Sequence, residues 1–79
     1  MSKYLEFSTI EEKPKTKIIR VWSRKSGDRL GLIKWFGRWR QYAFFPEDNT
    51  IFNTECLEDI RIYIKGMMEE RRETKKEHI

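Results

Sequence analysis

Apolar and polar residues alternate with a period of two through residues 16–45, which is the pattern of half-buried β-strands. A first strand is predicted over 16–25, with Ile19 and Val21 on one face and Trp22 on the other. Neither face is purely polar. This is expected when a helix covers one face of a sheet and the other face stays amphipathic, with the stems of basic side chains lying along aromatic rings.

A β-hairpin is predicted next, in the stretch R-L-G-L-I-K-W-F-G-R-W-R-Q-Y-A-F-F-P that follows a Ser-Gly-Asp turn signal. The chain is expected to reverse at Gly37, between an arm at 30–36 and an arm at 38–45. Two registers are open. A two-residue turn that ends at Gly37 puts Trp35 and Trp39 on opposite faces, and a shift by one residue puts them on the same face.

The segments on either side of these strands are less regular. Residues 3–8 are a candidate short strand, and 9–15 are predicted to be its connection to the next strand, because Pro14 cannot donate a ladder hydrogen bond. Residues 51–52 are a candidate for a brief pairing with a neighbouring strand. The expected sheet region therefore spans 3–52.

A C-terminal helix is predicted over 54–72. Asn53 or Thr54 can cap its first turn, and acidic residues follow where the helix dipole favours negative charge. Gly66 is expected to let the helix approach the sheet closely, which would offset its low helix propensity. Apolar residues recur at helical spacing along one stripe, formed by Leu57, Ile60, Ile64, Met67 and Met68.

These elements predict an α+β fold, in which a small antiparallel sheet of three to five strands carries one C-terminal α-helix packed on one face. A single domain, 1–79, is expected, since a chain of 79 residues can bury only one modest core. Residues 73–79 are expected to be a frayed tail. The predicted contacts between sheet and helix join Leu30, Leu32, Trp39 and Phe45 to Leu57, Ile60 and Ile64.

The distribution of charge predicts that the sheet is positively charged. The net charge is +4, and residues 15–45 hold nine Lys and Arg against Asp28 alone, so the sheet is expected to attract anions. No apolar run approaches the roughly 20 residues of a membrane span, and the N-terminus lacks the layout of a signal peptide. A cytoplasmic protein without a membrane partner is the expectation.

The residue inventory argues against catalysis. One Cys and one His are too few for a disulfide or a zinc site. Cys56 is interpreted as a small apolar residue in the first turn of the helix, and His78 as part of the solvated tail. There is no Gly-rich phosphate loop, nucleophile elbow or H-E-x-x-H motif. We therefore expect a protein that is not an enzyme and that uses no cofactor or metal.

Two motifs carry a resemblance to known proteins. The hairpin matches the pattern G-x-I-K-W-x-x-x-W-R-Q-Y-x-F-F-P, and the predicted helix begins with a match to C-L-x-D-I. In these motifs the chain resembles a group of small uncharacterised proteins of the phage and prophage type. The resemblance covers roughly residues 3–66, and it implies a cytoplasmic, phage-related accessory protein without catalytic residues. The matched positions are Gly31, Ile33, Lys34, Trp35, Trp39, Arg40, Gln41, Tyr42, Phe44, Phe45, Pro46, Cys56, Leu57, Asp59 and Ile60.

Basic residues alternate with aromatic residues on the predicted sheet, as they do in proteins that bind single-stranded nucleic acid. In such proteins rings stack on bases, and Arg and Lys contact phosphates. We therefore predict a small basic non-catalytic binding module, with nucleic acid as its partner on the open face of the sheet. The candidate residues for this nucleic-acid or partner surface are Arg20, Trp22, Arg24, Lys34, Arg38, Arg40 and Tyr42.

Two alternatives stay open at the level of sequence. The same Trp, Tyr and Arg composition is typical of interface hot spots, so a protein–protein interaction module is the alternative: a phage accessory or host-factor-binding protein, or a homodimer. A second interpretation treats Trp35, Trp39 and Phe45 as core residues, and the basic side chains as protection against edge-to-edge aggregation. Monomer and homodimer are both compatible with the sequence.

Overall fold

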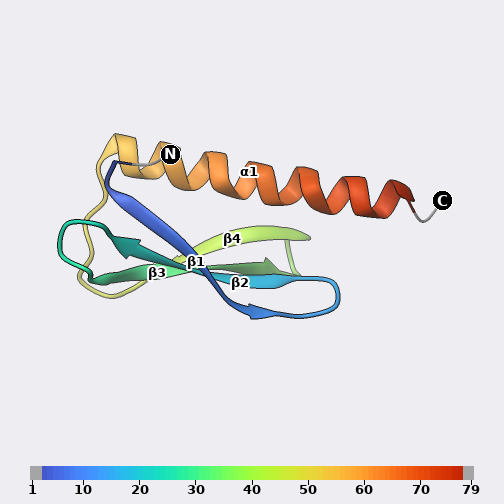
Figure 1. Ribbon diagram of the computed structural model, residues 1–79, viewed down its shortest axis with the longest axis horizontal. Coiled ribbons are helices and arrows are strands. Elements are labelled where there is room, and N and C mark those ends of the chain that lie inside the picture. Colours follow the sequence, from blue (N-terminus) through green and yellow to red (C-terminus); the bar gives the residue numbers. More distant parts are fainter. Residues whose placement is uncertain (1–2, 78–79) are drawn as a thin grey trace.

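The computed structural model describes the backbone of residues 3–77 and the side chains of residues 3–71. Four strands form one antiparallel sheet in chain order, and a long helix lies across one face of it (Figure 1). The predicted α+β fold is therefore confirmed. The elements are β1 (Leu5–Glu12), β2 (Lys17–Ser23), β3 (Arg29–Phe36), β4 (Gln41–Pro46) and α1 (Thr54–Glu77).

The first strand is longer than predicted. β1 continues through residues 9–12, where a connection was expected, and the β1–β2 turn closes when the Lys13 amide donates to the Thr16 carbonyl at 2.7 Å. A bulge between Thr9 and Glu11 interrupts the ladder with β2. β1 is an edge strand with an exposed, polar second half, so its sequence lacks the alternation that marks the inner strands. The candidate pairing at 51–52 is wrong, because these residues are in no strand.

The core lies between the sheet and α1, and the sheet's share of it follows the period-two pattern. Ile19 and Val21 of β2 are fully buried, as predicted for that face, and Ile33 of β3 is fully buried beside them. α1 contributes Cys56, Ile60 and Met67. The interpretation of Cys56 as a small apolar residue in the first helical turn is confirmed, since the residue is buried in this core.

The β3–β4 hairpin turns through four residues, 37–40, so neither of the two registers considered from the sequence is right. The last pair before the turn is Phe36 with Gln41, which makes Trp35 the partner of Tyr42. Arg40 completes the turn in the left-handed region, with φ at 52°. The second arm consequently begins three residues later than predicted. The partner of Trp35 moves by four residues, from 38 to 42, and such an even shift keeps each side chain of the arm on the face that the two-residue turn gave it.

Most of the predicted contacts between sheet and helix are wrong, because α1 covers the opposite face of the hairpin from the one predicted. Leu32 pairs with Phe45, and both lie on the face away from the core residues Gly31 and Ile33. Trp39 lies in the turn and is 64% exposed. Leu30 does pack against the core, where a bulge shifts the register between β2 and β3.

The helix begins at Thr54, as predicted, and ends beyond the predicted last residue. Asn53 caps it, because its side-chain oxygen accepts a hydrogen bond from the Cys56 amide at 2.8 Å. α1 then continues five residues beyond the predicted end at 72, to Glu77, so the expected frayed tail is helical that far. Residues 78–79 of that tail, including His78, lie outside the described residues.

Two predictions about the face of α1 are wrong. Leu57 is 52% exposed and does not belong to the buried stripe, which instead begins one residue earlier. Gly66 makes no close approach to the sheet, since an added Cβ would meet no atom within 4 Å. Within the described part of the chain, no helix is long and apolar enough to cross a membrane.

Candidate functional site

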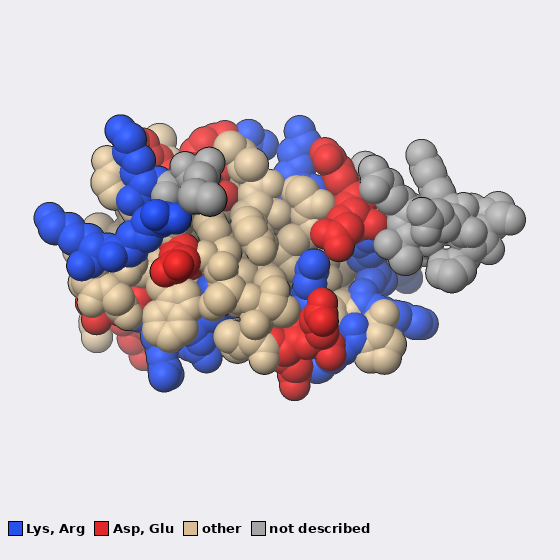
Figure 2. All heavy atoms as spheres, in the orientation of Figure 1, with Lys and Arg blue, Asp and Glu red and all other residues tan. Residues whose placement is uncertain are grey.

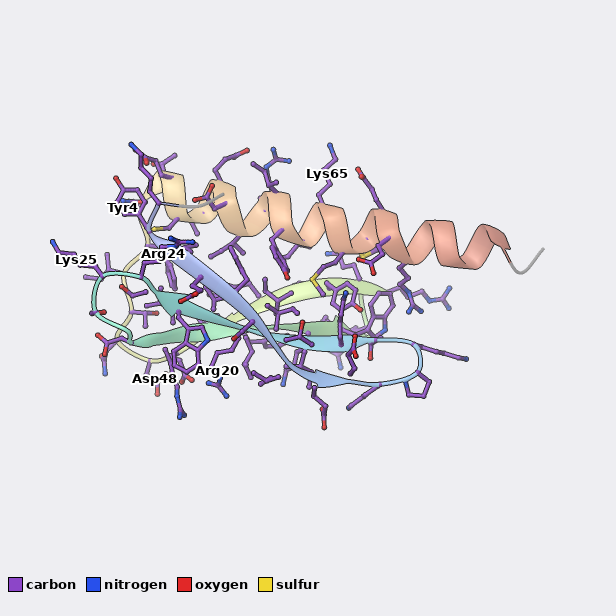
Figure 3. The ribbon with its side chains drawn as sticks, viewed as in Figure 1. Tyr4, Arg20, Arg24, Lys25, Asp48 and Lys65 are labelled. Carbon is purple, nitrogen blue, oxygen red and sulfur yellow. The ribbon has the colours of Figure 1, made fainter. Side chains whose placement is uncertain are left out.

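α1 covers one face of the sheet and leaves the other open (Figure 1). In the side view of Figure 2, charged side chains occupy both ends of the molecule, with an uncharged band between them. Arg20 lies on the side of the sheet away from α1, whereas Lys65 points outward from the helix (Figure 3). We name the half-buried side chains that alternate onto this uncovered side the open-face patch: Arg20, Trp22, Leu32, Lys34, Phe36, Ala43 and Phe45.

Trp22 is held in place near the end of β2. Its indole Nε1 donates to the Ser8 hydroxyl on β1 at 2.8 Å, which fixes the ring on the open face. The Arg20 and Arg29 guanidinium carbons lie 5.7 Å and 5.9 Å from the centre of the ring. These distances are within the range of cation–π attraction. The result is an oriented aromatic ring with a cation from each of two strands.

A second aromatic centre lies on β4. The Lys34 ammonium is 4.6 Å from the centre of the Phe45 ring. The centre of the Phe36 ring lies 6.1 Å from the centre of the Phe45 ring and 4.7 Å from the centre of the Trp39 ring, and both pairs meet edge-on. A row of three rings therefore runs from the open face to the β3–β4 turn, with a cation at one end.

Acidic side chains border the patch on one side. Arg20, whose side chain is 19% exposed, lies 4.0 Å from Glu47. Glu6 is the β1 residue opposite Trp22. An ion pair near the surface contributes about 0–1 kcal/mol, so Arg20 can exchange Glu47 for a stronger anion.

The structure brings three of the seven predicted site residues together on the open face: Arg20, Trp22 and Lys34. Arg38 and Arg40 are exposed in the β3–β4 turn, beside the end of the aromatic row. These five positions are compatible with one continuous surface along β2, β3 and the turn.

The predicted positions of Arg24 and Tyr42 on that surface are wrong. Arg24 follows the last residue of β2, and its Nε donates to the Leu5 carbonyl at 3.1 Å, on the side of β1 that faces α1 (Figure 3). Tyr42 is 4% exposed in the core, because α1 covers the face of the hairpin that carries Ile33 and Tyr42, and the sequence prediction had placed the opposite face under the helix. Its hydroxyl accepts a hydrogen bond from the Lys17 amide at 3.2 Å.

Sequence reasoning missed several members of the surface. Leu32 and Phe45 had been assigned to the covered face, and Arg29, Phe36 and Ser8 had no assigned role. The alternation within each strand contains the signal for Phe36, which shares the face of Lys34. The contact from Ser8 to Trp22 depends on the pairing of β1 with β2, which no local pattern indicates.

No three His, Cys, Asp or Glu side chains gather as a metal site would require in the part of the chain that is described. Glu58 and Arg61 form an ion pair on the outer surface of α1, with 2.6 Å between the charged groups. The hydrogen bond from Arg61 and the charge of Arg61 lower the pKa of Glu58. In the same way, Glu58 raises the pKa of Arg61. This pair spans one helical turn on an exposed surface, so it belongs to the stability of the helix and not to the open-face patch.

The fold and its surface define a class of small α+β protein: a four-stranded antiparallel meander with one face under a helix and the other carrying aromatic and basic side chains. The chain is 36% identical over 73 residues to an "Uncharacterized 9.3 kDa protein" of Acholeplasma phage L2, and the match covers 91% of this chain and 94% of the phage protein. The chain therefore belongs to the same family as that phage protein. No protein-family model and no solved structure matches it.

Proposed function

We propose that this protein binds single-stranded nucleic acid through the open-face patch. The observation that supports this most strongly is Trp22, whose ring is oriented by Ser8 and has the cations of Arg20 and Arg29 beside it. Such a ring can stack on a base while the cations contact the neighbouring phosphates. Stacking of one base on an aromatic side chain contributes about 1–3 kcal/mol.

The patch offers more than one stacking position. Trp22 is on β2 and Phe45 is on β4, so they are two strand spacings apart, roughly 10 Å. Rings at this separation serve different bases of one strand. Lys34, beside Phe45, supplies a cation for the second position as Arg20 does for the first.

A single strand fits this surface better than a duplex. Bases can reach rings on a sheet only when they are unstacked from one another, as in loops and single strands. The sheet also presents no helix or protruding ribbon from the open face to enter a duplex groove. We therefore expect weak, salt-sensitive binding to duplex DNA through charge alone.

Titration of labelled oligonucleotides, roughly ten nucleotides long, tests this proposal. Trp22→Leu should weaken single-strand binding by about fivefold to a hundredfold, the equivalent of one lost stack. Lys34→Ala should weaken it severalfold and make the salt slope shallower by about one phosphate contact. Lys65→Ala is the matched control, because it removes the same charge from the outer face of α1 (Figure 3).

The titration is run at about 50 mM and about 200 mM salt, since phosphate contacts lose affinity steeply over this range. Melting temperatures of the three variants establish that each is folded. Absence of single-strand binding at the lower salt concentration would refute the proposal. Equal losses for Lys34→Ala and Lys65→Ala would refute the open face as its site.

A protein partner is the second candidate, and Trp39 is the observation that favours it. This ring is 64% exposed at the tip of the β3–β4 turn, and exposed Trp side chains are typical anchors of protein interfaces. Sedimentation of the purified protein tests the homodimer: a dimer that Trp39→Ala converts to monomer, at any salt concentration, would favour this candidate over the first.

A further inference from the structure

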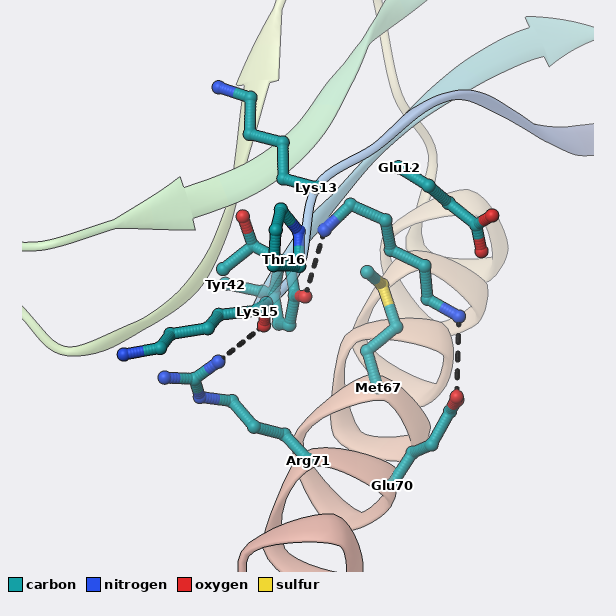
Figure 4. Close-up of a pocket in the computed structure, with 10 residues that line it drawn as sticks. Glu12, Lys13, Lys15, Thr16, Tyr42, Met67, Glu70 and Arg71 are labelled. Atoms are coloured by element: carbon teal, nitrogen blue, oxygen red, sulfur yellow. Dashed lines mark hydrogen bonds and ion pairs between the residues drawn. The ribbon is translucent and has the colours of Figure 1, made fainter.

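A cleft of about 700 Å³ opens between the β1–β2 turn and the C-terminal half of α1 (Figure 4). It lies at the end of the sheet, on the side that α1 covers, and so it is separate from the open-face patch. Its volume is that of pockets which bind small ligands. Its lining includes Lys13, Lys15, Lys17, Tyr42, Glu70 and Arg71.

The cleft contains a buried hydrogen-bond donor that lacks an acceptor. Tyr42 is 4% exposed, and its hydroxyl lies at the cleft. The hydroxyl oxygen accepts from the Lys17 amide, which leaves its own proton free to donate. Among the described residues, the Tyr42 hydroxyl donates to no hydrogen-bond acceptor. A ligand with an acceptor oxygen would satisfy it.

Arg71 is held beside this donor. Its guanidinium carbon lies 4.2 Å from the centre of the Trp35 ring, and one nitrogen donates to the Lys15 carbonyl at 2.6 Å. The Trp35 ring in turn meets the Tyr42 ring edge-on, with 5.5 Å between the ring centres. One hydrogen bond uses one of the five N–H donors of the guanidinium. The remaining donors are held in position, which lowers the entropic cost of binding an anion.

The charges of the cleft also favour an anion. Four cationic and two acidic side chains line it, for a net charge of +2. Glu70 is occupied by Lys17, 3.4 Å away, and lies on the opposite side of the cleft from Lys15 and Arg71 (Figure 4). The Lys15 ammonium has no partner in the described part of the chain. Lys15, Arg71 and Tyr42 therefore present donors without a carboxylate between them.

We infer that this cleft binds a phosphate monoester, carried by a free nucleotide or by the end of a nucleic-acid strand. The ammonium of Lys15 and the guanidinium of Arg71 bind its oxygens, and the Tyr42 hydroxyl donates to one of them. A phosphate monoester has three strong acceptor oxygens and about two negative charges, which matches this set of two cations and a neutral donor. The inference does not rest on the open-face proposal, because the two sites share no residue.

The test is an NMR titration of the full-length protein with two pairs of probes. One pair is adenosine monophosphate and adenosine, and the other is an oligothymidylate with and without a 5′-terminal phosphate. The phosphorylated member of at least one pair should shift the backbone amides of Lys13, of residues 15–17 and of Arg71, and its unphosphorylated partner should not. The responding pair identifies the source of the phosphate.

Two substitutions locate the site. Lys15→Ala and Tyr42→Phe should each weaken binding of the phosphorylated probe about fivefold or more. Lys25→Ala is the matched control, since it removes the same charge from the β2–β3 turn at the other end of the molecule (Figure 3). Lys15 is exposed, so its variant stays interpretable if Tyr42→Phe unfolds.

The inference is overturned if neither phosphorylated probe shifts these amides, or if Lys25→Ala weakens binding as much as Lys15→Ala does. Its failure is distinct from failure of the open-face proposal. Trp22→Leu should leave the response to adenosine monophosphate unchanged, and Lys15→Ala should leave binding of an unphosphorylated strand within about twofold of wild type.

Discussion

At the scale of single residues, Gly31 is the position where packing leaves least room for a side chain. An added Cβ would lie 2.5 Å from the Phe45 carbonyl oxygen and 2.7 Å from the Phe44 ring. Both neighbours belong to β4, which is paired with β3, so neither can move without disturbing the ladder. The glycine therefore permits the close contact between the two central strands of the aromatic surface and the ring that packs over them.

Gly31→Ala should destabilise the protein by about 1–3 kcal/mol, the usual cost of overpacking. Gly66→Ala is its control on α1, where the added methyl group meets nothing, and it should stabilise the protein by about 0.5–1 kcal/mol. Urea denaturation measures both changes. A Gly31→Ala variant as stable as wild type would show that β3 and β4 are less tightly joined than described.

The residue-level prediction of the site was right where the strand pattern alone sufficed. Ile19, Val21 and Trp22 lie on the faces that alternation assigns, because β2 is a regular inner strand. Tyr42 was misplaced because no local pattern shows which face of the hairpin the helix covers: Tyr42 shares the face of Ile33, which packs in the core. Phe45 was misplaced for the same reason, since it shares the opposite face with its partner Leu32.

At the scale of elements, the start of α1 depends on a single side chain. The sequence allowed Asn53 or Thr54 as the cap, and only the Asn53 oxygen reaches an amide, that of Cys56. The same turn carries Cys56 and Ile60 into the core, so the cap fixes the position at which the helix meets the sheet.

Asn53→Ala should lower the free energy of unfolding by about 1 kcal/mol, the typical cost of a lost cap. Thr54→Ala is the neighbouring control and should cost less, because Thr54 is exposed and makes no hydrogen bond with its side chain among the described contacts. Thermal unfolding followed by circular dichroism compares the two. A larger loss for Thr54→Ala would reverse the assignment of the cap.

The elements themselves were largely predictable, since period-two and helical patterns identified three of the four strands and the helix. Two features were not. The β3–β4 turn has no strong local signal for its length: Gly37 suggested a two-residue turn, but Arg40 adopts the positive φ that completes a longer one. The second half of β1 is exposed, with Ile10 as its one apolar residue, and it forms a strand because β2 is there to pair with it.

At the scale of the whole molecule, the two faces of the sheet have different roles. α1 closes the core on one face and completes the cleft at one end. The other face carries Trp22 and the row of rings that ends at Trp39. The predicted basic excess of the sheet contributes to both regions, since Lys15 and Lys17 line the cleft while Arg20, Arg29 and Lys34 flank the rings.

The indole N–H of Trp22 gives the most direct test of whether single-stranded nucleic acid binds at the open-face patch. This proton is donated to Ser8, so its NMR resonance reports on the ring at the centre of the patch. Titration with an unphosphorylated oligothymidylate of roughly ten nucleotides at low salt should shift this resonance and the amides of Arg20, Lys34 and Phe45. The amides of Glu58 and Lys65 on the outer surface of α1 should stay in place. Shifts confined to α1, or none at any concentration of the strand, would contradict the proposed function.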